Sequence, residues 1–183
     1  MNNSPYSTIR ELLEQVRDFD EKIELPDVIA FNRHHQYAFH IDKVKKEVTE
    51  GTALGIEDGL VVKWIIESAA LTNEEIAGLT TLIRDTVIGA VGEQKAKNVF
   101  VKTSTGFYKP EGGGHGGATT DDVSIMSINA GPLKVKASGG IYSREDLDKM
   151  VDAGASRIGT SAGLEIINGE KANITEIENG KNI

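Results

Sequence analysis

The amino-acid sequence predicts an α/β fold in which short parallel strands alternate with helices, and three observations lead to this prediction. From Val61 onward, short apolar runs typical of strands alternate four times with longer helical runs. The helical runs begin at Ser or Thr residues that can cap a helix. Glycine and hydroxyl residues gather directly after the strand-like runs, at the edge where parallel sheets bind ligands.

The N-terminal third predicts one strand between two helices. Residues 7–20 place apolar side chains at helical spacing, and residues 22–31 are typical of a strand. Helical spacing returns over residues 37–48, and residues 49–59 are expected to form a loop.

The remaining elements follow from apolar runs and capping residues. Residues 61–67 predict a buried strand, because five of the seven are apolar. Thr72 and Glu75 have the spacing of a capping box, so a helix is expected from there to about Val91. The elements expected after it are a strand over 99–102, a Gly-rich loop over 107–117, a helix capped by Thr119 and ending near Asn129, a strand over 133–137, a helix from Ser143 to Gly154, a strand over 157–160 and a short helix over 164–168.

Composition excludes several classes of function. The 183 residues carry 28 acidic and 20 basic side chains, a formal net charge of −8, which argues against a nucleic-acid-binding protein. The absence of cysteine excludes disulfides, zinc thiolates, iron–sulfur clusters and cysteine nucleophiles. The sequence has no run of about 18 apolar residues and no signal-peptide core. We therefore expect a cytoplasmic protein that binds neither nucleic acid nor membranes.

Two lysines at consecutive strand ends are the main catalytic candidates. Lys102 closes the run VFVK and precedes Thr-Ser-Thr-Gly, and Lys136 lies in LKVK before Ala-Ser-Gly-Gly. Consecutive parallel strands are usually neighbours, and two ammonium groups held close together lower each other's pKa, as burial also does. An uncharged lysine amine can attack a carbonyl group. The alternative, that each lysine merely extends its charged end to solvent, is given equal weight on these residues alone.

A glycine-rich anion site is the second candidate. Gly139 and Gly140 precede the helix capped by Ser143, and the run GTSAG over 159–163 follows the next strand. Backbone N–H groups and a helix N-terminus at such loops can hold a phosphate. The alternative is that these glycines only permit tight turns.

The N-terminal third offers weaker candidates. Glu24 and Asp27 flank Pro26, and either could act as a general acid or base, although carboxylates at strand ends are more often simply solvated. His34 and His35 lack further ligands at metal-binding spacing, so a surface loop is expected there.

Four motifs together resemble deoxyribose-phosphate aldolase. They are VFVKTSTGF (99–107), GGATTDDVSIM (116–126), VKASGGI (135–141) and GASRIGTSAG (154–163), and their order and spacing match the family as well. The run VVKWIIESAALTNEEI (61–76) is similar to the preceding strand and helix of the family. The resemblance is strong over residues 61–169 and weaker over residues 20–48.

The resemblance implies a (β/α)8 TIM-barrel class I aldolase that uses neither a metal nor another cofactor. Such enzymes reversibly cleave 2-deoxy-D-ribose 5-phosphate to acetaldehyde and glyceraldehyde 3-phosphate through a lysine Schiff base. Lys102 matches the Schiff-base lysine, and Lys136 matches the lysine that lowers its pKa and assists proton transfer. Glu24 falls where the family has a catalytic aspartate, so its carboxylate stands on an arm one methylene longer. The substrate and phosphate positions implied are Thr105, Gly106, Gly139, Gly140, Gly159 and Ser161.

The resemblance also implies that the barrel is incomplete. Five strands, over 22–31, 61–67, 99–102, 133–137 and 157–160, correspond to strands four to eight of the family. We expect residues 1–183 to form a single α/β domain that associates as a homo-oligomer or with a chain that completes the barrel, because open strand edges invite pairing. Two alternatives remain open: a non-catalytic fragment that binds a phosphate ligand, and a different phosphate-binding barrel enzyme.

Overall fold

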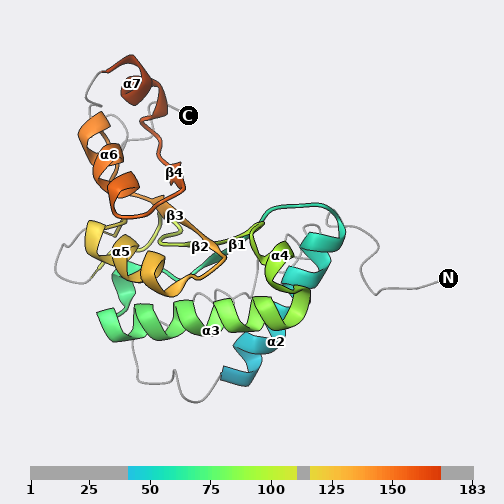
Figure 1. Ribbon diagram of the computed structural model, residues 1–183. Helices are drawn as coiled ribbons and strands as arrows, with labels where there is room; N and C mark the ends of the chain where they lie inside the picture. The colour runs from blue at the N-terminus through green and yellow to red at the C-terminus, as the bar shows by residue number, and fades with distance from the viewer. Residues whose placement is uncertain (1–40, 111–115, 170–183) are drawn as a thin grey trace, which may run out of the picture.

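A parallel sheet forms the centre of the computed structural model, which describes residues 41–110 and 116–169. Its four strands are β1 (Val62–Ile65), β2 (Val99–Lys102), β3 (Lys134–Ser138) and β4 (Arg157–Gly159). They lie side by side in sequence order, and all three neighbouring pairs are parallel (Figure 1). Sequential parallel order is the arrangement expected of repeated strand–helix units.

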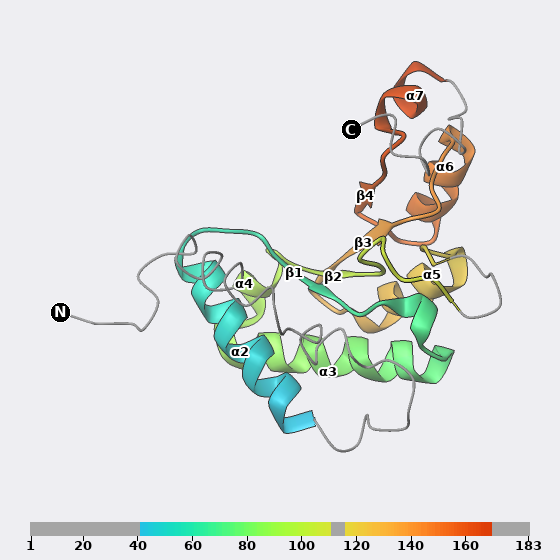
Figure 2. The ribbon, with the colours of Figure 1, turned by 180° about the vertical axis from the view of Figure 1, so that it is seen from behind.

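Helices connect consecutive strands and cover one face of the sheet. In chain order they are α2 (Ile41–Glu57), the 3₁₀ turn η2 (Ser68–Ala70), α3 (Asn73–Val91), α4 (Glu93–Ala96), α5 (Thr120–Asn129), α6 (Arg144–Asp152) and α7 (Gly163–Asn168). Both ribbon views show α2, α3 and α5 on the same side of the sheet, with α6 and α7 beside β4 (Figures 1 and 2). No helix in the described ranges is long and apolar enough to cross a membrane.

The predicted helix starts at Thr72, Thr119 and Ser143 are confirmed by their hydrogen bonds. At the start of α3, Glu75 N donates to Thr72 Oγ1 at 3.3 Å, and Thr72 N donates to Glu75 Oε2 at 2.8 Å. The same bond from the third helical residue to the capping hydroxyl starts α5, from Asp122 N to Thr119, and α6, from Asp146 N to Ser143. These bonds satisfy N–H groups that a helix leaves without an intrahelical partner.

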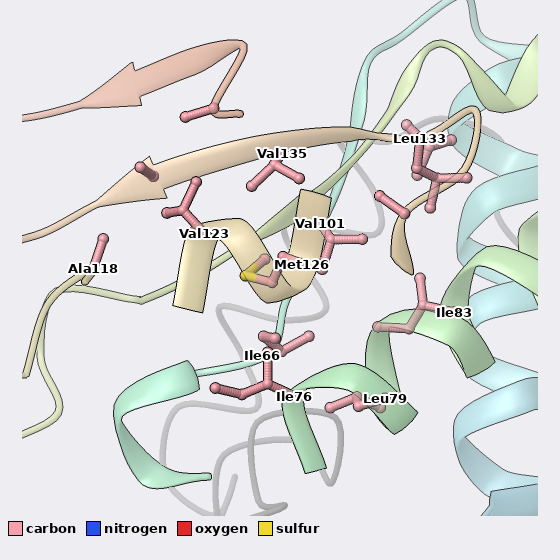
Figure 3. Packing of buried hydrophobic residues seen from close by; sticks show 14 of the residues in the cluster. Ile66, Ile76, Leu79, Ile83, Val101, Ala118, Val123, Met126, Leu133 and Val135 are labelled. Carbon is pink, nitrogen blue, oxygen red and sulfur yellow. The ribbon is translucent and has the colours of Figure 1, made fainter. Parts of the chain in front are cut away.

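The hydrophobic core lies between the sheet and the helices. Alternate residues of the inner strands, Val99 and Val101 on β2 and Val135 and Ala137 on β3, belong to it because successive strand side chains point to opposite faces. They pack with side chains of α3 and α5 such as Leu79, Ile83, Val123 and Met126 (Figure 3). Burial of each large aliphatic side chain contributes roughly 1.5–3 kcal/mol, so this layer dominates the stability of the fold.

The opposite face of the sheet is rich in positive charge. The alternation that turns Val99 and Val101 to the core turns Phe100 and Lys102 to this face. Phe100 is buried there beneath two cations: Arg157 Cζ lies 4.6 Å from the ring centroid and Lys134 Nζ lies 5.6 Å from it. Cations at these distances are attracted to the face of an aromatic ring, and the long side chains also shield the ring from water.

The expected loop over residues 49–59 is wrong, because α2 continues to Glu57. Two glycines of this stretch, Gly51 and Gly55, serve helix packing. A Cβ on Gly51 would lie 2.9 Å from Trp64 Cη2, and one on Gly55 would lie 2.6 Å from Val62 Cγ2. The glycines therefore let α2 approach β1 closely, and Trp64 Nε1 donates a hydrogen bond to Thr52 Oγ1 of the same helix at 3.0 Å.

Smaller differences concern short elements and strand ends. The sequence did not predict α4 or η2, and the strand expected over 61–67 is limited to Val62–Ile65. That strand is half-buried rather than buried, because it is the edge strand of the described sheet. The helix expected over 7–20, the strand expected over 22–31 and the candidate residues between 24 and 35 lie outside the described residues.

Candidate functional site

The loops that follow β2 and β3 are joined by side-chain hydrogen bonds. Thr103 Oγ1 accepts a bond from Ser138 N at 3.0 Å and donates to Ser138 O at 3.2 Å. Ser104 Oγ donates to the carbonyl of Gly116 at 3.0 Å. Thr103 and Ser104 are fully buried, so these bonds hold the strand ends in a dry environment where they are not exchanged for water. The result is a fixed rim at the carboxyl ends of the strands.

Lys102 and Lys136 lie directly opposite each other in this rim. They are register partners of the β2–β3 pair, so their side chains leave the same face of the sheet. Both lysines are half-buried. The end of the Lys136 side chain lies over Gly159 of β4: a Cβ at Gly159 would be 2.8 Å from Lys136 Cε and 3.2 Å from Lys136 Nζ. The absence of a side chain at Gly159 therefore leaves the space that Lys136 occupies.

The pKa values of both amines are lowered from the ordinary value of 10.5. For Lys102 the largest cause is burial; the Glu67 carboxylate raises its pKa in opposition, and Lys63 lowers it further. For Lys136 burial again comes first, followed by repulsion from Lys102, Lys63 and Arg157. Repulsion between the two site lysines is mutual, so each favours the neutral form of the other. Both shifts move in the direction that a lysine nucleophile requires.

Glu67 is a buried carboxylate two residues beyond the end of β1. Only 2% of its surface is exposed. Its Oε2 accepts hydrogen bonds from the backbone N–H of Thr105 at 3.0 Å and from the Thr105 hydroxyl, whereas Oε1 is buried and has no hydrogen-bond partner among residues 41–110 and 116–169. Its backbone is left-handed, with φ 51° and ψ 60°, and no other non-glycine residue in the described ranges has a positive φ.

The glycines after β3 form a half-buried turn of backbone, which we call the cradle. Gly139 and Gly140 both have left-handed backbones, with φ values of 82° and 74°. The backbone of Gly117 packs so closely on them that a Cβ at Gly117 would lie 2.4 Å from the carbonyl carbon of Gly139. Neither of their N–H groups donates a hydrogen bond to another residue in the described ranges. Free N–H groups on adjacent residues with such backbones are suited to binding an anion.

A hydroxyl group links this cradle to the loop after β4. Thr160 Oγ1 donates to the carbonyl of Ile141 at 2.6 Å and accepts from Ala162 N at 2.9 Å. The link places the run Gly159–Ser161 beside Gly139 and Gly140, and the hydroxyl-bearing Ser161 is exposed. The glycines expected to share one pocket are therefore on neighbouring loops.

Three backbone N–H groups near the predicted phosphate site already donate hydrogen bonds within the chain. The N–H of Gly106 donates to Ser104 Oγ at 2.9 Å. At the start of α6, Asp146 N bonds to the Ser143 side chain and Tyr142 N donates to Asp146 Oδ2 at 3.1 Å. The anion-binding capacity of the rim therefore rests on the cradle rather than on the end of α6.

The structure brings together all the predicted site residues that it describes along one rim: Lys102, Lys136, Thr105, Gly106, Gly139, Gly140, Gly159 and Ser161. Glu24 lies outside the described residues. Sequence reasoning missed Lys63 and Glu67. The sequence carries a signal for Glu67, a carboxylate at the end of an apolar run, but the strand predicted over 61–67 includes this residue. Lys63 lies earlier on that strand and acts on both site lysines through its charge alone.

Relatives and solved structures share both the sequence and the fold. The chain is 44% identical over 126 residues to a deoxyribose-phosphate aldolase of Listeria monocytogenes, covering 68% of this chain and 46% of the relative. It is 42% identical over 132 residues to that of Bacillus subtilis, covering 72% and 52%. The crystallised deoxyribose-phosphate aldolase of Aeropyrum pernix, described as tetrameric, matches with a TM-score of 0.55 and 31% identity over 72% of this chain and 50% of that one. No protein-family model matches the chain.

This chain is a member of the deoxyribose-phosphate aldolase family. It spans about half the length of the curated deoxyribose-phosphate aldolases that it matches. Its sheet and outer helices correspond to part of the barrel of deoxyribose-phosphate aldolase, so the predicted (β/α)8 fold class and the predicted family are both confirmed.

Proposed function

We propose that this chain performs the chemistry of deoxyribose-phosphate aldolase, with Lys102 as the nucleophile. The observation that carries the proposal is the register pairing of Lys102 with Lys136, since both amines are half-buried and have lowered pKa values. Burial and a neighbouring positive charge lower the pKa of a lysine relative to that of a lone surface lysine, so the fraction of neutral amine at a given pH is larger. The substrate class is a 2-deoxy sugar phosphate.

The proposed reaction begins with attack of neutral Lys102 on the aldehyde carbon of 2-deoxy-D-ribose 5-phosphate. Loss of water gives an imine, which takes up the electron pair of the C2–C3 bond when glyceraldehyde 3-phosphate leaves. The enamine that remains takes a proton and is hydrolysed to acetaldehyde, which releases Lys102. Lys136 transfers protons during these steps, and Glu24 is proposed as the carboxylate that takes part in the same proton transfers.

The rim supports a site for the phosphate group. The free N–H groups of Gly139 and Gly140, together with the exposed hydroxyl of Ser161, are donors suited to a phosphate oxygen. Thr105, which Glu67 fixes by a hydrogen bond, follows Lys102 by three residues and is proposed to line the pocket. The cationic face formed by Lys63, Lys134 and Arg157 adds long-range attraction for an anionic substrate.

Reductive trapping tests the proposal. Acetaldehyde with sodium cyanoborohydride is expected to add one ethyl group to Lys102, located by peptide mass spectrometry, and 2-deoxyribose 5-phosphate is expected to compete. Lys102→Ala removes the adduct, whereas Lys95→Ala, which alters an exposed lysine of α4, leaves it unchanged. A wild-type chain with no adduct on Lys102 would overturn the proposal.

A second candidate function, binding of a phosphate ligand without turnover, is favoured by the cradle alone. Its free N–H groups depend on the backbone of residues 117, 139 and 140 and need no lysine chemistry. Inorganic phosphate that raises the melting temperature of a chain lacking any Lys102 adduct would support this candidate. Retro-aldol turnover would exclude it. For either function, we propose assembly as a homo-oligomer or with a chain that completes the barrel.

A further inference from the structure

Glu67 is a buried charged group that the proposed chemistry leaves unused. Carboxylates are almost never fully buried unless they are paired, and within the part of the chain that the structure describes this one has a hydrogen-bond partner on only one oxygen. A half-satisfied buried carboxylate is costly, so its retention needs a reason beyond stability.

The fold places Glu67 beside Lys102. Two backbone hydrogen bonds flank it, from Ile66 N to the carbonyl of Lys102 at 3.0 Å and from Ser68 N to the carbonyl of Thr103 at 2.8 Å. These bonds extend the β1–β2 pairing beyond Ile65, the register partner of Lys102. Glu67 is therefore held from both sides against the strand end that bears the nucleophile.

The backbone of Glu67 is also strained in a way that fixes its side chain. A left-handed conformation costs a non-glycine residue free energy, and such residues concentrate at functional sites. Here the conformation directs Oε2 to both hydrogen-bonding groups of Thr105, across 38 residues of sequence. The flanking bonds and the Thr105 bonds together leave the carboxylate little freedom.

We propose that Glu67 is a positioning residue of this site: through Oε2 it fixes Thr105, and through Oε1 it is the counter-ion of the cationic imine on Lys102. This inference rests on the proposed function. When aldehyde and neutral amine combine, the carbonyl oxygen leaves as water after taking up protons, and the imine nitrogen keeps one N–H and a positive charge. A buried carboxylate with a free oxygen is the acceptor that this N–H requires.

The charges around Lys102 are consistent with this role. Lys63 of β1 and Glu67, which follows β1, act on Lys102 with opposite signs. From β3 the facing group is Lys136, which in turn faces Arg157 of β4. Among these groups Glu67 is the one carboxylate acting on Lys102. The Glu67 carboxylate raises the pKa of free Lys102 and so disfavours the neutral amine. Its favourable effect on the reaction is therefore expected after Lys102 has formed the cationic imine.

Two labelling experiments on Glu67→Gln test the proposal. In the first, acetic anhydride is applied over a series of pH values and the acetylation of Lys102 is followed by peptide mass spectrometry. Removal of the negative charge is expected to shift the labelling midpoint of Lys102 to lower pH. In the second, acetaldehyde with cyanoborohydride is expected to trap less adduct near neutral pH, by on the order of tenfold to a hundredfold, although more amine is free.

Opposite changes in amine reactivity and imine yield distinguish a counter-ion from a structural residue, since general damage would not make Lys102 more reactive while lowering its adduct. Glu50→Gln, which removes the same charge from an exposed position on α2, is the matched control and is expected to change neither readout. Glu67→Asp keeps the charge on a shorter arm and replaces Glu67→Gln if that variant does not fold, with changes of the same sign and smaller size.

The outcomes separate this inference from the proposed function. An unmoved acetylation midpoint in a folded Glu67 variant overturns the placement of its charge beside Lys102. A midpoint that moves while the trapped adduct rises with it overturns the counter-ion role. An absence of adduct in the wild-type chain overturns the proposed function and, with it, the counter-ion role, while the acetylation series still reports whether the charge of Glu67 acts on Lys102.

Discussion

Thr103 holds both backbone groups of Ser138 with one hydroxyl. Its Oγ1 accepts from Ser138 N and donates to Ser138 O, at 3.0 and 3.2 Å, and both residues are buried. At the end of β2, these two side-chain hydrogen bonds take the place of backbone hydrogen bonds between β2 and β3, just before β3 leads into the cradle. The relative position of Lys102, the residue before Thr103, and Gly139, the residue after Ser138, depends on these bonds.

Thr103→Val is therefore expected to destabilise the fold by about 1–3 kcal/mol, because Val matches the shape of Thr but removes the acceptor of the buried Ser138 N–H, while the Ser138 carbonyl keeps only its bond from Ala118 N. The free energy of unfolding in urea measures the change. Thr49→Val, at an exposed position of α2, is the control and is expected to stay within about 0.5 kcal/mol. Equal stability of the two variants would contradict the role given to Thr103.

Lys136→Leu is expected to raise the pKa of Lys102, because a positive charge on the facing strand is removed. A raised pKa leaves less neutral amine near pH 7, so reductive trapping on Lys102 slows there and recovers as the pH rises. The measurement is the trapping rate against pH. A profile that coincides with that of the wild type would show that Lys136 does not act on Lys102 through its charge.

Lys63→Met is expected to raise the pKa of Lys102 in the same direction, because Lys63 lowers it through its charge. Lys63 is exposed, so salt screens its effect more than it screens a buried pair. The difference between variant and wild type in the labelling midpoint of Lys102 is therefore expected to shrink between low salt and about 1 M salt. A difference independent of salt would indicate a change in structure rather than in charge.

Gly159→Ala is expected to displace the end of the Lys136 side chain. The new methyl group would lie 2.5 Å from Ser138 Oγ and 2.8 Å from Lys136 Cε, so one of them must move. We expect a modest loss of stability and a changed pH profile for trapping at Lys102. Gly163→Ala is the matched control, because a Cβ there meets no atom within 4 Å. Identical profiles for both variants would argue against the contact.

The regular part of the fold could be predicted because its signals are local. Capping residues such as Thr72 and Ser143 fix helix starts through bonds to residues three positions away, and apolar runs identify the inner strands. The pairing of Lys102 with Lys136 followed from a general rule about consecutive parallel strands. These inferences needed no knowledge of distant contacts.

The rest depends on contacts between distant segments. Gly51 and Gly55 interrupt a helical pattern in the sequence, and only the proximity of Trp64 and Val62 explains why a helix needs them. Glu67 belongs to the site because Thr105, far along the chain, meets its carboxylate. No local pattern predicts a left-handed glutamate, since its own propensity disfavours that conformation.

The left-handed backbone at position 67 implies a conflict between thermal stability and catalytic turnover. Glycine or asparagine would relieve roughly 1–3 kcal/mol of strain at that position, and neither has a side chain that delivers a carboxylate to Thr105 and Lys102. Laboratory evolution for heat resistance alone should therefore drift toward those two residues at this position. Selection that also demands turnover should retain the acid and find its stabilising substitutions elsewhere.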